Sequence, residues 1–334
     1  MSADAPSPAL AHIRGDGAQT QTVAEHLLGT AALCRRFAAA FDAADYGDAA
    51  AKLHDIGKYS AGFQRRLRGG AKVDHSTAGA QQAWQRRWAE IAFAVAGHHG
   101  GLPDGGTRID PAESATLLGR MKRPLEPYDG WQREITLPTL SPRAAKDAYS
   151  QAFFTRMLYS CLVDADYLDT EAFMNGTPAP RGDYDDIPTL LARLQDHIAP
   201  WLQPAAGLNA RRSDILRACL AAGQSQPRGL YTLTVPTGGG KTVSSLAFAL
   251  AQAAAQGLQR VIYVIPYTSI IDQNAEVFAG ILGRKNVLEH HAGAEYSAAE
   301  NSDEAAYRKA LAAENWDAPV VVTTSVQFFE SLYG

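Results

Sequence analysis

The fold of the C-terminal part of the chain is decided by one segment, Thr234-Val235-Pro236-Thr237-Gly238-Gly239-Gly240-Lys241-Thr242. It follows a predicted strand, Leu230 to Val235, and opens a predicted alanine-rich helix, Thr242 to Gln256. In this context the backbone N–H groups of a glycine turn can surround a phosphate, and the helix N-terminus adds positive potential. We expect Lys241 to reach the β- and γ-phosphates of ATP, and the Thr242 hydroxyl to ligate Mg²⁺. The predicted nucleotide-binding residues are Thr237, Gly238, Gly239, Gly240, Lys241 and Thr242.

Strands and helices continue to alternate after this loop. Arg260 to Pro266 and Val320 to Thr324 are rich in β-branched residues and predict strands, and Ile270 to Leu282 predicts a helix between them. This alternation favours a parallel sheet with right-handed crossovers. We therefore expect an α/β domain over residues 206–334.

The N-terminal part has a different pattern. Apolar residues recur at helical spacing through most of Thr22 to Leu202, and a stretch rich in glycine and proline, Gly100 to Pro142, predicts a long loop with short helical pieces. Several prolines follow between residues 178 and 204. Since 334 residues correspond to about two domains, we predict an all-α domain over residues 1–205, and the α/β domain after it.

Composition excludes several classes of protein. With 46% hydrophobic and 20% charged residues, the chain is not largely disordered, and a net charge of −4 means that any nucleic-acid surface is a local patch. The three cysteines are far apart, which argues against a disulfide framework or a thiolate zinc site and favours the reducing cytoplasm. No secretory signal or membrane-spanning run is expected, so no membrane partner is predicted.

Histidines and acids in the N-terminal part predict a metal centre. Five histidines lie in four settings, at His26, at His54-Asp55, at His75 and at the pair His98-His99. Adjacent side chains on a regular helix point about 100° apart, so His54 and Asp55 cannot both aim at one atom from regular mid-helix positions without help, but they can flank a pair of metal ions. A carboxylate has two oxygens and can bridge two ions, which about 3.5–4 Å apart can hold a phosphodiester between them. Imidazole and carboxylate ligands suit Fe, Mn, Ni, Co or Zn better than Mg²⁺.

A further carboxylate is expected from the helix that contains Asp164, Asp166 and Asp169. A helical wheel places Asp166 at the border of the inward stripe, Asp164 more outward, and Asp169 inward but nearer the helix end. The wheel alone leaves the three open. His12, His197 and the pair His290-His291 are interpreted as ordinary histidines.

These segments resemble those of the HD-type metal-dependent phosphohydrolases, and most of all the nuclease domain of the CRISPR-associated type I helicase-nuclease, particularly its subtype C form. The segments that carry the resemblance are Glu25-His26-Leu27, His54-Asp55-Ile56-Gly57-Lys58, Asp74-His75-Ser76, His98-His99-Gly100-Gly101 and Ala165-Asp166-Tyr167-Leu168-Asp169-Thr170.

The resemblance implies two divalent transition-metal ions (Fe, Mn, Ni or Co) and a set of ligands. One ion is held by the residues that match His26, His54, Asp55 and Asp166, and the other by those that match Asp55, His75, His98 and His99. It favours Asp166 over Asp164. Asp55 and Lys58 are then the catalytic residues, with Lys58 steadying a phosphate oxygen.

The C-terminal part resembles the first RecA-like domain of a superfamily 2 helicase, a group that relaxes the glycine position occupied here by Val235. Two further segments resemble its single-stranded-DNA contacts, and the predicted DNA-binding residues are Thr268, Ser269, Gln273, Thr323 and Thr324. Helix capping explains the hydroxyls of the first segment equally well.

The resemblance implies a cytoplasmic enzyme of antiviral defence. A Cascade surveillance complex with CRISPR RNA opens target DNA, and the effector cuts the displaced single strand as an endo- or exonuclease, coupled to ATP-dependent 3'-5' unwinding. The chain has no Asp-Glu-x-His run and no second RecA-like domain, so we expect a fragment without sustained unwinding. The alternatives are an HD phosphohydrolase acting on free nucleotides, and a non-catalytic DNA-binding P-loop module.

Overall fold

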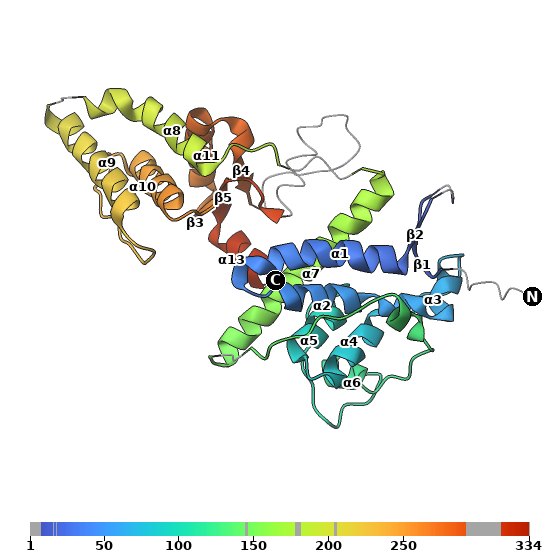
Figure 1. The fold of residues 1–334 in the computed structure, drawn as a ribbon. Coiled ribbons are helices and arrows are strands. Elements are labelled where there is room, and N and C mark those ends of the chain that lie inside the picture. The colour runs from blue at the N-terminus through green and yellow to red at the C-terminus, as the bar shows by residue number, and fades with distance from the viewer. Residues whose placement is uncertain are drawn as a thin grey trace, which may run out of the picture. The chain divides into compact units, whose positions relative to one another are not determined.

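The computed structural model of the chain describes residues 8–15, 17, 19–143, 146–177, 182–203, 206–291 and 315–333. The contacts divide the chain into two compact units, residues 1–179 and residues 180–334. Figure 1 shows helices and a small hairpin in the first unit, and both strands and helices in the second. Helix α8 (Ile187–Ile198) packs on helices of the second unit, and the domain boundary near residue 205 stays a prediction.

The first unit is a helical bundle with a small hairpin at its start. The hairpin strands β1 and β2 pair antiparallel. The elements are β1 (Leu10–Ile13), β2 (Thr20–Thr22), α1 (Val23–Ala38), η1 (Ala39–Phe41), α2 (Ala44–His54), η2 (Ile56–Tyr59), α3 (Ala61–Arg66), α4 (Ser76–Gln85), α5 (Ala89–Gly97), α6 (Leu117–Arg120), η3 (Asp129–Arg133) and α7 (Ala148–Asn175). The stretch from Gly100 to Pro142 is a loop with two short helical pieces, α6 and η3, as predicted.

Small and branched apolar side chains explain how these helices pack. The alanines of α2 at positions 49–51 are fully buried, which lets neighbouring helices approach α2 closely, and Leu53 of the same helix lies in the core with Leu27 of α1 and Leu158 of α7. Helix α1 begins at a capping box, in which the Thr22 hydroxyl accepts from the Glu25 N–H and the Glu25 carboxylate accepts from the Thr22 N–H. The bundle therefore holds α1, α2, α5 and α7 around one core.

The second unit contains a three-stranded parallel sheet in the order β3-β5-β4, which confirms the predicted parallel arrangement. Its core joins Leu194 of α8, Leu250 of α10, Phe278 of α11 and Val320 of β5. The elements after α8 are η4 (Ala199–Leu202), α9 (Gly207–Ser225), α10 (Lys241–Ala255), β3 (Val261–Ile265), α11 (Thr268–Leu282), η5 (Arg284–Asn286), β4 (Val287–His290), β5 (Val320–Thr324) and α13 (Ser325–Tyr333).

Two predictions about this sheet were wrong. The segment Leu230 to Val235 is not a strand in the structure, because it pairs with no strand among the described residues and Leu230 is 97% exposed. A strand needs a neighbour for its backbone hydrogen bonds, which apolar composition alone cannot supply. The second error was to miss β4, whose four residues are too few to show an alternating pattern.

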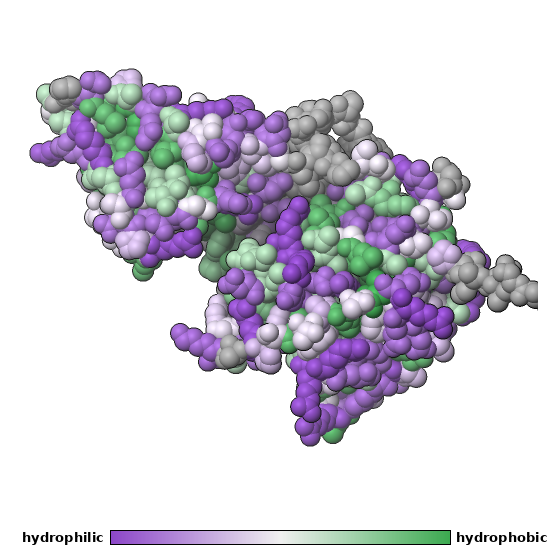
Figure 2. All heavy atoms as spheres, viewed as in Figure 1, coloured by the Kyte–Doolittle hydropathy of each residue, from purple (hydrophilic) through white to green (hydrophobic). Residues whose placement is uncertain are grey.

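The surface in Figure 2 mixes hydrophilic and hydrophobic side chains. Large apolar side chains of the second unit that are exposed include Trp201, Leu208 and Leu230. Among the described residues, no helix combines the length and apolar character needed to cross a membrane. Cys34, Cys161 and Cys219 are buried free thiols.

Candidate metal centre

The candidate metal centre lies where the helices of the first unit converge on Asp55. Its side chains come from α1, from the end of α2, from the residue before α4, from the residues after α5 and from α7. They form two groups that share Asp55, one made of His26, His54, Asp55 and Asp166 and the other of Asp55, His75, His98 and His99. The sequence-predicted ligands are thus brought together, in the two sets that the resemblance implies.

The end of helix α2 lets the side chains of His54 and Asp55 point toward the same centre. His54 is the last residue of α2, and Asp55 leaves the helix with φ −120° and ψ 18° before the short η2 turn begins. Both side chains are fully buried. The helix end therefore supplies the change of direction that two adjacent ligands need.

One oxygen of Asp55 belongs to the first group. Asp55 Oδ2 lies 3.4 Å from His26 Nε2 and 3.3 Å from His54 Nε2, and Asp166 Oδ1 lies 3.2 Å from His26 Nε2. The two Nε2 atoms are 3.2 Å apart. Asp166 is thus the acid of α7 in this group, and Asp164 belongs to neither group.

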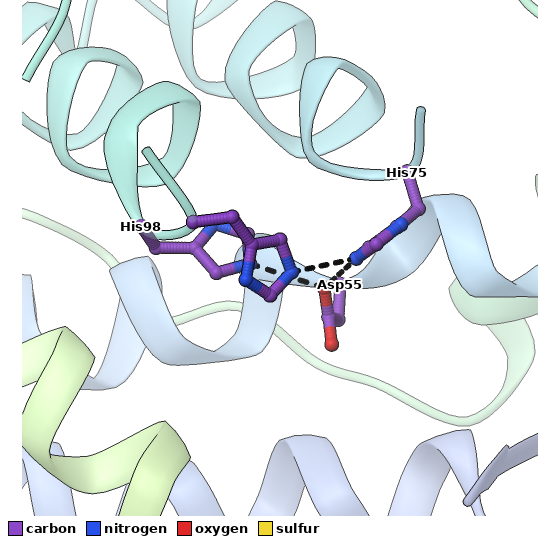
Figure 3. Close-up of side chains that lie close together, drawn as sticks. Asp55, His75 and His98 are labelled. Atoms are coloured by element: carbon purple, nitrogen blue, oxygen red, sulfur yellow. Dashed lines mark hydrogen bonds and ion pairs between the residues drawn. The ribbon is translucent and has the colours of Figure 1, made fainter. Parts of the chain in front are cut away.

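The other oxygen of Asp55 belongs to the second group. Asp55 Oδ1 lies 3.3 Å from both His75 Nε2 and His98 Nε2. Figure 3 shows the side chains of His75 and His98 pointing toward Asp55. His99 Nε2 lies 2.8 Å from His75 Nε2. Each oxygen of the carboxylate thus faces its own pair of imidazoles.

Hydrogen bonds on the far side of four imidazole rings turn Nε2 toward Asp55. Nδ1 of His54 lies 2.6 Å from the Ala51 carbonyl and Nδ1 of His98 lies 2.8 Å from the Val95 carbonyl, while His75 has a longer contact to Val73. His26 Nδ1 donates to Asp169 Oδ2 at 2.8 Å. A ring that donates from Nδ1 keeps the Nε2 lone pair free for a metal ion.

The donor set fits divalent cations. Both Asp55 oxygens and His98 Nε2 are buried and have no hydrogen-bond partner among the described residues. Facing imidazole lone pairs repel each other unless a proton or a cation lies between them. Two cations satisfy these atoms together, because each oxygen of the shared carboxylate faces one group.

The carboxylates of the first group favour positive charge on the neighbouring imidazoles. Burial disfavours the imidazolium form of His26, but Asp166, Asp169 and Asp55 outweigh burial and raise the pKa of His26 to about 9. Burial is likewise outweighed at His54, where Asp55 and Asp166 raise the pKa to about 10.

The pKa values of Asp55, His75 and His99 are lowered. Burial opposes ionisation of Asp55, but Lys58, His54 and His75 hold its pKa well below the usual range. The pKa of His99 falls to about 4 through burial and the neighbouring His98, and burial lowers the pKa of His75. His75 and His99 are therefore neutral at pH 7 and ready to act as ligands.

Three residues beside the centre support it. They are His12 and Gln21, which the sequence did not single out, and Asp169, one of the three acids left open. His12 of β1, interpreted from the sequence as an ordinary histidine, lies 3.2 Å from Lys58 Nζ and belongs to neither group of candidate ligands. Gln21 and Asp169 complete a set of hydrogen bonds around His12 and His26. No feature of the sequence could have singled out His12, because a lone histidine in a short strand has no distinctive spacing.

Lys58 is buried beside the centre. Its Nζ lies 2.6 Å from Asp55 Oδ2, although this ion pair lacks hydrogen-bond geometry. Asp74, which precedes His75, instead accepts from the Thr77 N–H and hydroxyl and pairs with Arg123. Asp74 therefore holds the start of α4 in place.

In the second unit, the glycine loop leads directly into α10. Gly238 and Gly240 have φ of 81° and 84°, a conformation that favours glycine, and a Cβ at Gly239 would lie 2.5 Å from Val235 Cγ1. A cavity of about 620 Å³ adjoins the loop, between Gly238, Gly240 and Ser244 on one side and Trp201 and Arg212 on the other. Lys241 is exposed at the first position of α10.

The residues predicted to contact DNA have mixed environments. Gln273 is exposed, Thr324 accepts from the Gln327 N–H at the start of α13, and Thr323 is fully buried. Thr268 begins α11, and the side chains of Thr268 and Ser269 lie outside the described ones. Binding of DNA by these five residues stays a prediction.

A third group of possible metal ligands, Asp272, Glu289 and His291, lies in the second unit. His291 Nε2 is 2.8 Å from Glu289 Oε1 and 3.7 Å from Asp272 Oδ1. His291 therefore has two acidic neighbours, Glu289 of β4 and Asp272 of α11.

Comparison with known proteins extends over both units. Residues 23–128 match the HD domain model, and residues 205–333 match the model of the Type III restriction enzyme, res subunit. The CRISPR-associated nuclease/helicase Cas3 of Haloferax volcanii is 25% identical over 372 residues, which cover 85% of this chain and 39% of that protein. The crystal structure of T. fusca Cas3 matches with a TM-score of 0.56 and 17% identity, over 96% of this chain and 44% of that one.

The chain is similar to Cas3 proteins over both of its units. The crystal structure of T. fusca Cas3-ATP matches as well, with a TM-score of 0.55 and 17% identity over 95% of this chain and 43% of that one. The predicted fold, a helical HD-type domain followed by an α/β P-loop region, is confirmed. This Cas3-like chain spans less than half the length of these relatives. His12 and Asp166 both lie outside residues 23–128 and were placed at the centre by the structure.

Proposed function

We propose that the first unit is a metal-dependent nuclease that cuts single-stranded DNA. The observation that carries this proposal is the position of Asp55, whose two buried oxygens face two separate sets of imidazoles. An active site built for two cations suits phosphodiester hydrolysis, which needs positive charge on both sides of the phosphorus atom.

The residues of the chain have distinct tasks in this proposal. His26, His54, Asp55 and Asp166 hold one ion, and Asp55, His75, His98 and His99 hold the other. Divalent ions bound there supply Lewis-acid stabilisation of the phosphodiester and of the attacking water. Lys58 donates a hydrogen bond to a phosphate oxygen. Burial of the ligands keeps bulk water away and so strengthens these interactions.

The nature of the substrate is supported by the rest of the chain. The P-loop and its adjoining cavity favour binding of ATP with Mg²⁺, and the similarity to Cas3 favours DNA over a free nucleotide as the substrate. We infer that the protein acts in the cytoplasm in CRISPR interference, where a Cascade complex with CRISPR RNA presents the DNA strand and 3'-5' unwinding by the whole protein feeds it to the nuclease.

One assay separates this function from its rivals. The chain is stripped of metal and supplied with Mn²⁺, Ni²⁺ or Co²⁺, and single-stranded DNA and free nucleotides are offered in parallel. We expect metal-dependent cutting of DNA that Asp55→Ala lowers by about a thousandfold or more, as removal of a shared ligand disables both ions. Asp129→Ala, an exposed acid of the same unit, should cut at the wild-type rate.

The other outcomes contradict the proposal. Hydrolysis of free nucleotides without DNA cutting identifies an HD phosphohydrolase. Turnover of neither substrate, with metal bound, identifies a non-catalytic module.

A further inference from the structure

Hydrogen bonds connect the N-terminal hairpin to the turn that carries Lys58. The side-chain amide of Gln64 in α3 makes them. Its Oε1 accepts from the Leu10 N–H at 3.1 Å, and its Nε2 donates to the Leu10 carbonyl at 2.9 Å and to the Lys58 carbonyl at 2.8 Å. Strand β1 and the backbone of Lys58 are thus held at a fixed spacing. Because β2 runs directly into α1 through the Thr22 capping box, the hairpin also joins the helix that carries His26.

The hydrogen bonds of Gln21 determine which nitrogen of His12 carries a proton. Gln21 Nε2 donates to Asp169 Oδ2 at 2.9 Å, and a carboxylate only accepts, so the amide orientation of Gln21 is fixed. Its Oε1 then faces His12 Nδ1 at 2.8 Å, which makes Nδ1 the protonated nitrogen. His12 Nε2 consequently has a free lone pair, and it lies 3.2 Å from Lys58 Nζ.

The ring of His12 is also held by packing. It meets the His26 ring edge-on, with centroids 4.7 Å apart, and stacks on Phe173 at 6.2 Å. His12 belongs to neither group of candidate ligands among the described residues. Its lone pair is therefore directed at an ammonium group and not at Asp55.

Lys58 needs such a partner. Its ammonium lies 2.6 Å from Asp55 Oδ2, the oxygen that both His26 and His54 face. A lysine on a flexible four-carbon stem is a mobile point charge. Asp55 and His12 lie beside its ammonium among the described residues, and without His12 the ammonium would stay on Asp55 alone, where its charge competes with a cation.

We propose that His12 is a positioning residue, which accepts a hydrogen bond from Lys58 and holds that ammonium at the edge of the metal centre, where it meets a phosphate oxygen of the substrate. This role rests on the proposed nuclease function. It assigns the N-terminal hairpin, which precedes the matched HD region, to the active site.

Two substitutions that keep different parts of the imidazole test the role. The amide of Gln reaches the position of imidazole Nε2 and can still accept from Lys58, whereas the shorter amide of Asn reaches only the position of Nδ1 and keeps the contact to Gln21. We expect His12→Asn to lower kcat for DNA cutting by about tenfold at saturating Mn²⁺, with KM unchanged, and His12→Gln to retain most of the rate. The control His197→Asn, a histidine of α8 in the second unit, should leave the rate unchanged.

A double-mutant cycle shows whether His12 acts through Lys58. In a Lys58→Met chain, His12→Asn should have no further effect on kcat, because the group that His12 positions is already absent. An equal loss in both backgrounds, or a wild-type rate for His12→Asn, overturns the proposal. Loss of Mn²⁺ binding by His12→Asn in titration calorimetry also overturns it, because His12 would then be a ligand.

A readout without activity keeps the inference separate from the nuclease function. In ¹⁵N NMR spectra of the whole chain, His12 should be the neutral tautomer with its proton on Nδ1, and the Lys58 side chain should become more mobile in His12→Asn than in His12→Gln. If the wild-type chain cuts no DNA, the proposed function fails while these spectra still decide the role of His12. A proton on Nε2, or equal Lys58 mobility in both variants, contradicts it.

Discussion

At the scale of single residues, Asp55 explains why the centre holds together. A fully buried carboxylate is costly unless opposite charge compensates it. Here Lys58 and the surrounding histidines provide that charge, and protons on His26 and His54 take the role that cations have in the loaded site. Protonation of those imidazoles should therefore stabilise the metal-free chain.

This coupling predicts how stability depends on pH. In the folded, metal-free chain the pKa values of His26 and His54 are about 9 and about 10, against 6.5 for a free histidine. Between pH 7 and 8 the folded state thus binds more protons than the unfolded state, and the free energy of unfolding should fall as pH rises. We expect the Tm of the first unit, measured in EDTA, to fall over this interval.

Excess Mn²⁺ should reverse the trend, since the metal binds the deprotonated imidazoles and its affinity rises with pH. The interval ends at pH 8 because the buried thiols add the same fall only above about 8.5. Burial lowers the pKa of His12 and His99 to about 4 and also lowers the pKa of His75, and this opposing contribution fades above pH 7, where unfolded histidine with its pKa of 6.5 has mostly lost its proton. A Tm in EDTA that rises from pH 7 to 8 would contradict the arrangement of charges.

Residue types and spacing, together with the resemblance, predicted which side chains gather at the candidate centre but not the residues that support them. His54-Asp55 and His98-His99 could be recognised because ionisable residues recur in short segments. Asp166 could be chosen over Asp164 only by the resemblance. The helical wheel also did not show that Asp169 lies outside both groups of candidate ligands and instead accepts a hydrogen bond from His26 Nδ1. Supporting contacts such as His12 to Lys58 join residues 46 positions apart, and no local pattern encodes them.

At the scale of elements, close approach of helices sets the positions of the ligands. A Cβ at Gly79 of α4 would lie 1.8 Å from the Leu53 carbonyl oxygen of α2 and 3.0 Å from Val95 Cγ1 of α5. Leu53 directly precedes His54, and α4 begins directly after His75. The absence of a side chain at Gly79 thus brings two ligand-bearing elements together.

Gly79→Ala should therefore destabilise the first unit by about 1–3 kcal/mol, because backbone must move to admit the methyl group. It should also weaken Mn²⁺ binding, since His54 and His75 move apart. Gly280→Ala is the matched control: Gly280 is exposed in α11 with nothing within 4 Å of a Cβ, so the helix should gain about 0.5–1 kcal/mol. Thermal unfolding of both variants checks this, and an unchanged Tm for Gly79→Ala would show that α4 is not packed against α2 in this way.

Element types were predictable where a periodic pattern was long. The helices α7, α10 and α11 and the strands β3 and β5 lie where the sequence predicts them. The segment 230–235 has the composition of a strand. A strand also needs a neighbouring strand to hydrogen-bond with, and no described strand pairs with this segment. Sequence reasoning about single elements cannot supply that partner.

At the scale of the whole molecule, the chain has two sites of different chemistry, one in each unit. The first unit gathers imidazoles and carboxylates, which bind cations, and the second presents glycine N–H groups and Lys241, which bind phosphate anions. Their residues do not overlap, and each unit has its own core. Occupation of one site should therefore not require the residues of the other.

Separate substitutions test this independence. We expect Lys241→Ala to weaken binding of a fluorescent ATP analogue by about 10–100-fold, because a charged hydrogen bond to the phosphates contributes about 1.5–3 kcal/mol. The same variant should bind Mn²⁺ in the first unit and cut single-stranded DNA at the wild-type rate, whereas Asp55→Ala should lose cutting and keep its affinity for the analogue. Lys146→Ala, an exposed lysine of the first unit, should change neither. Loss of DNA cutting in Lys241→Ala, with the chain still folded, would mean that the two sites depend on each other even without added nucleotide.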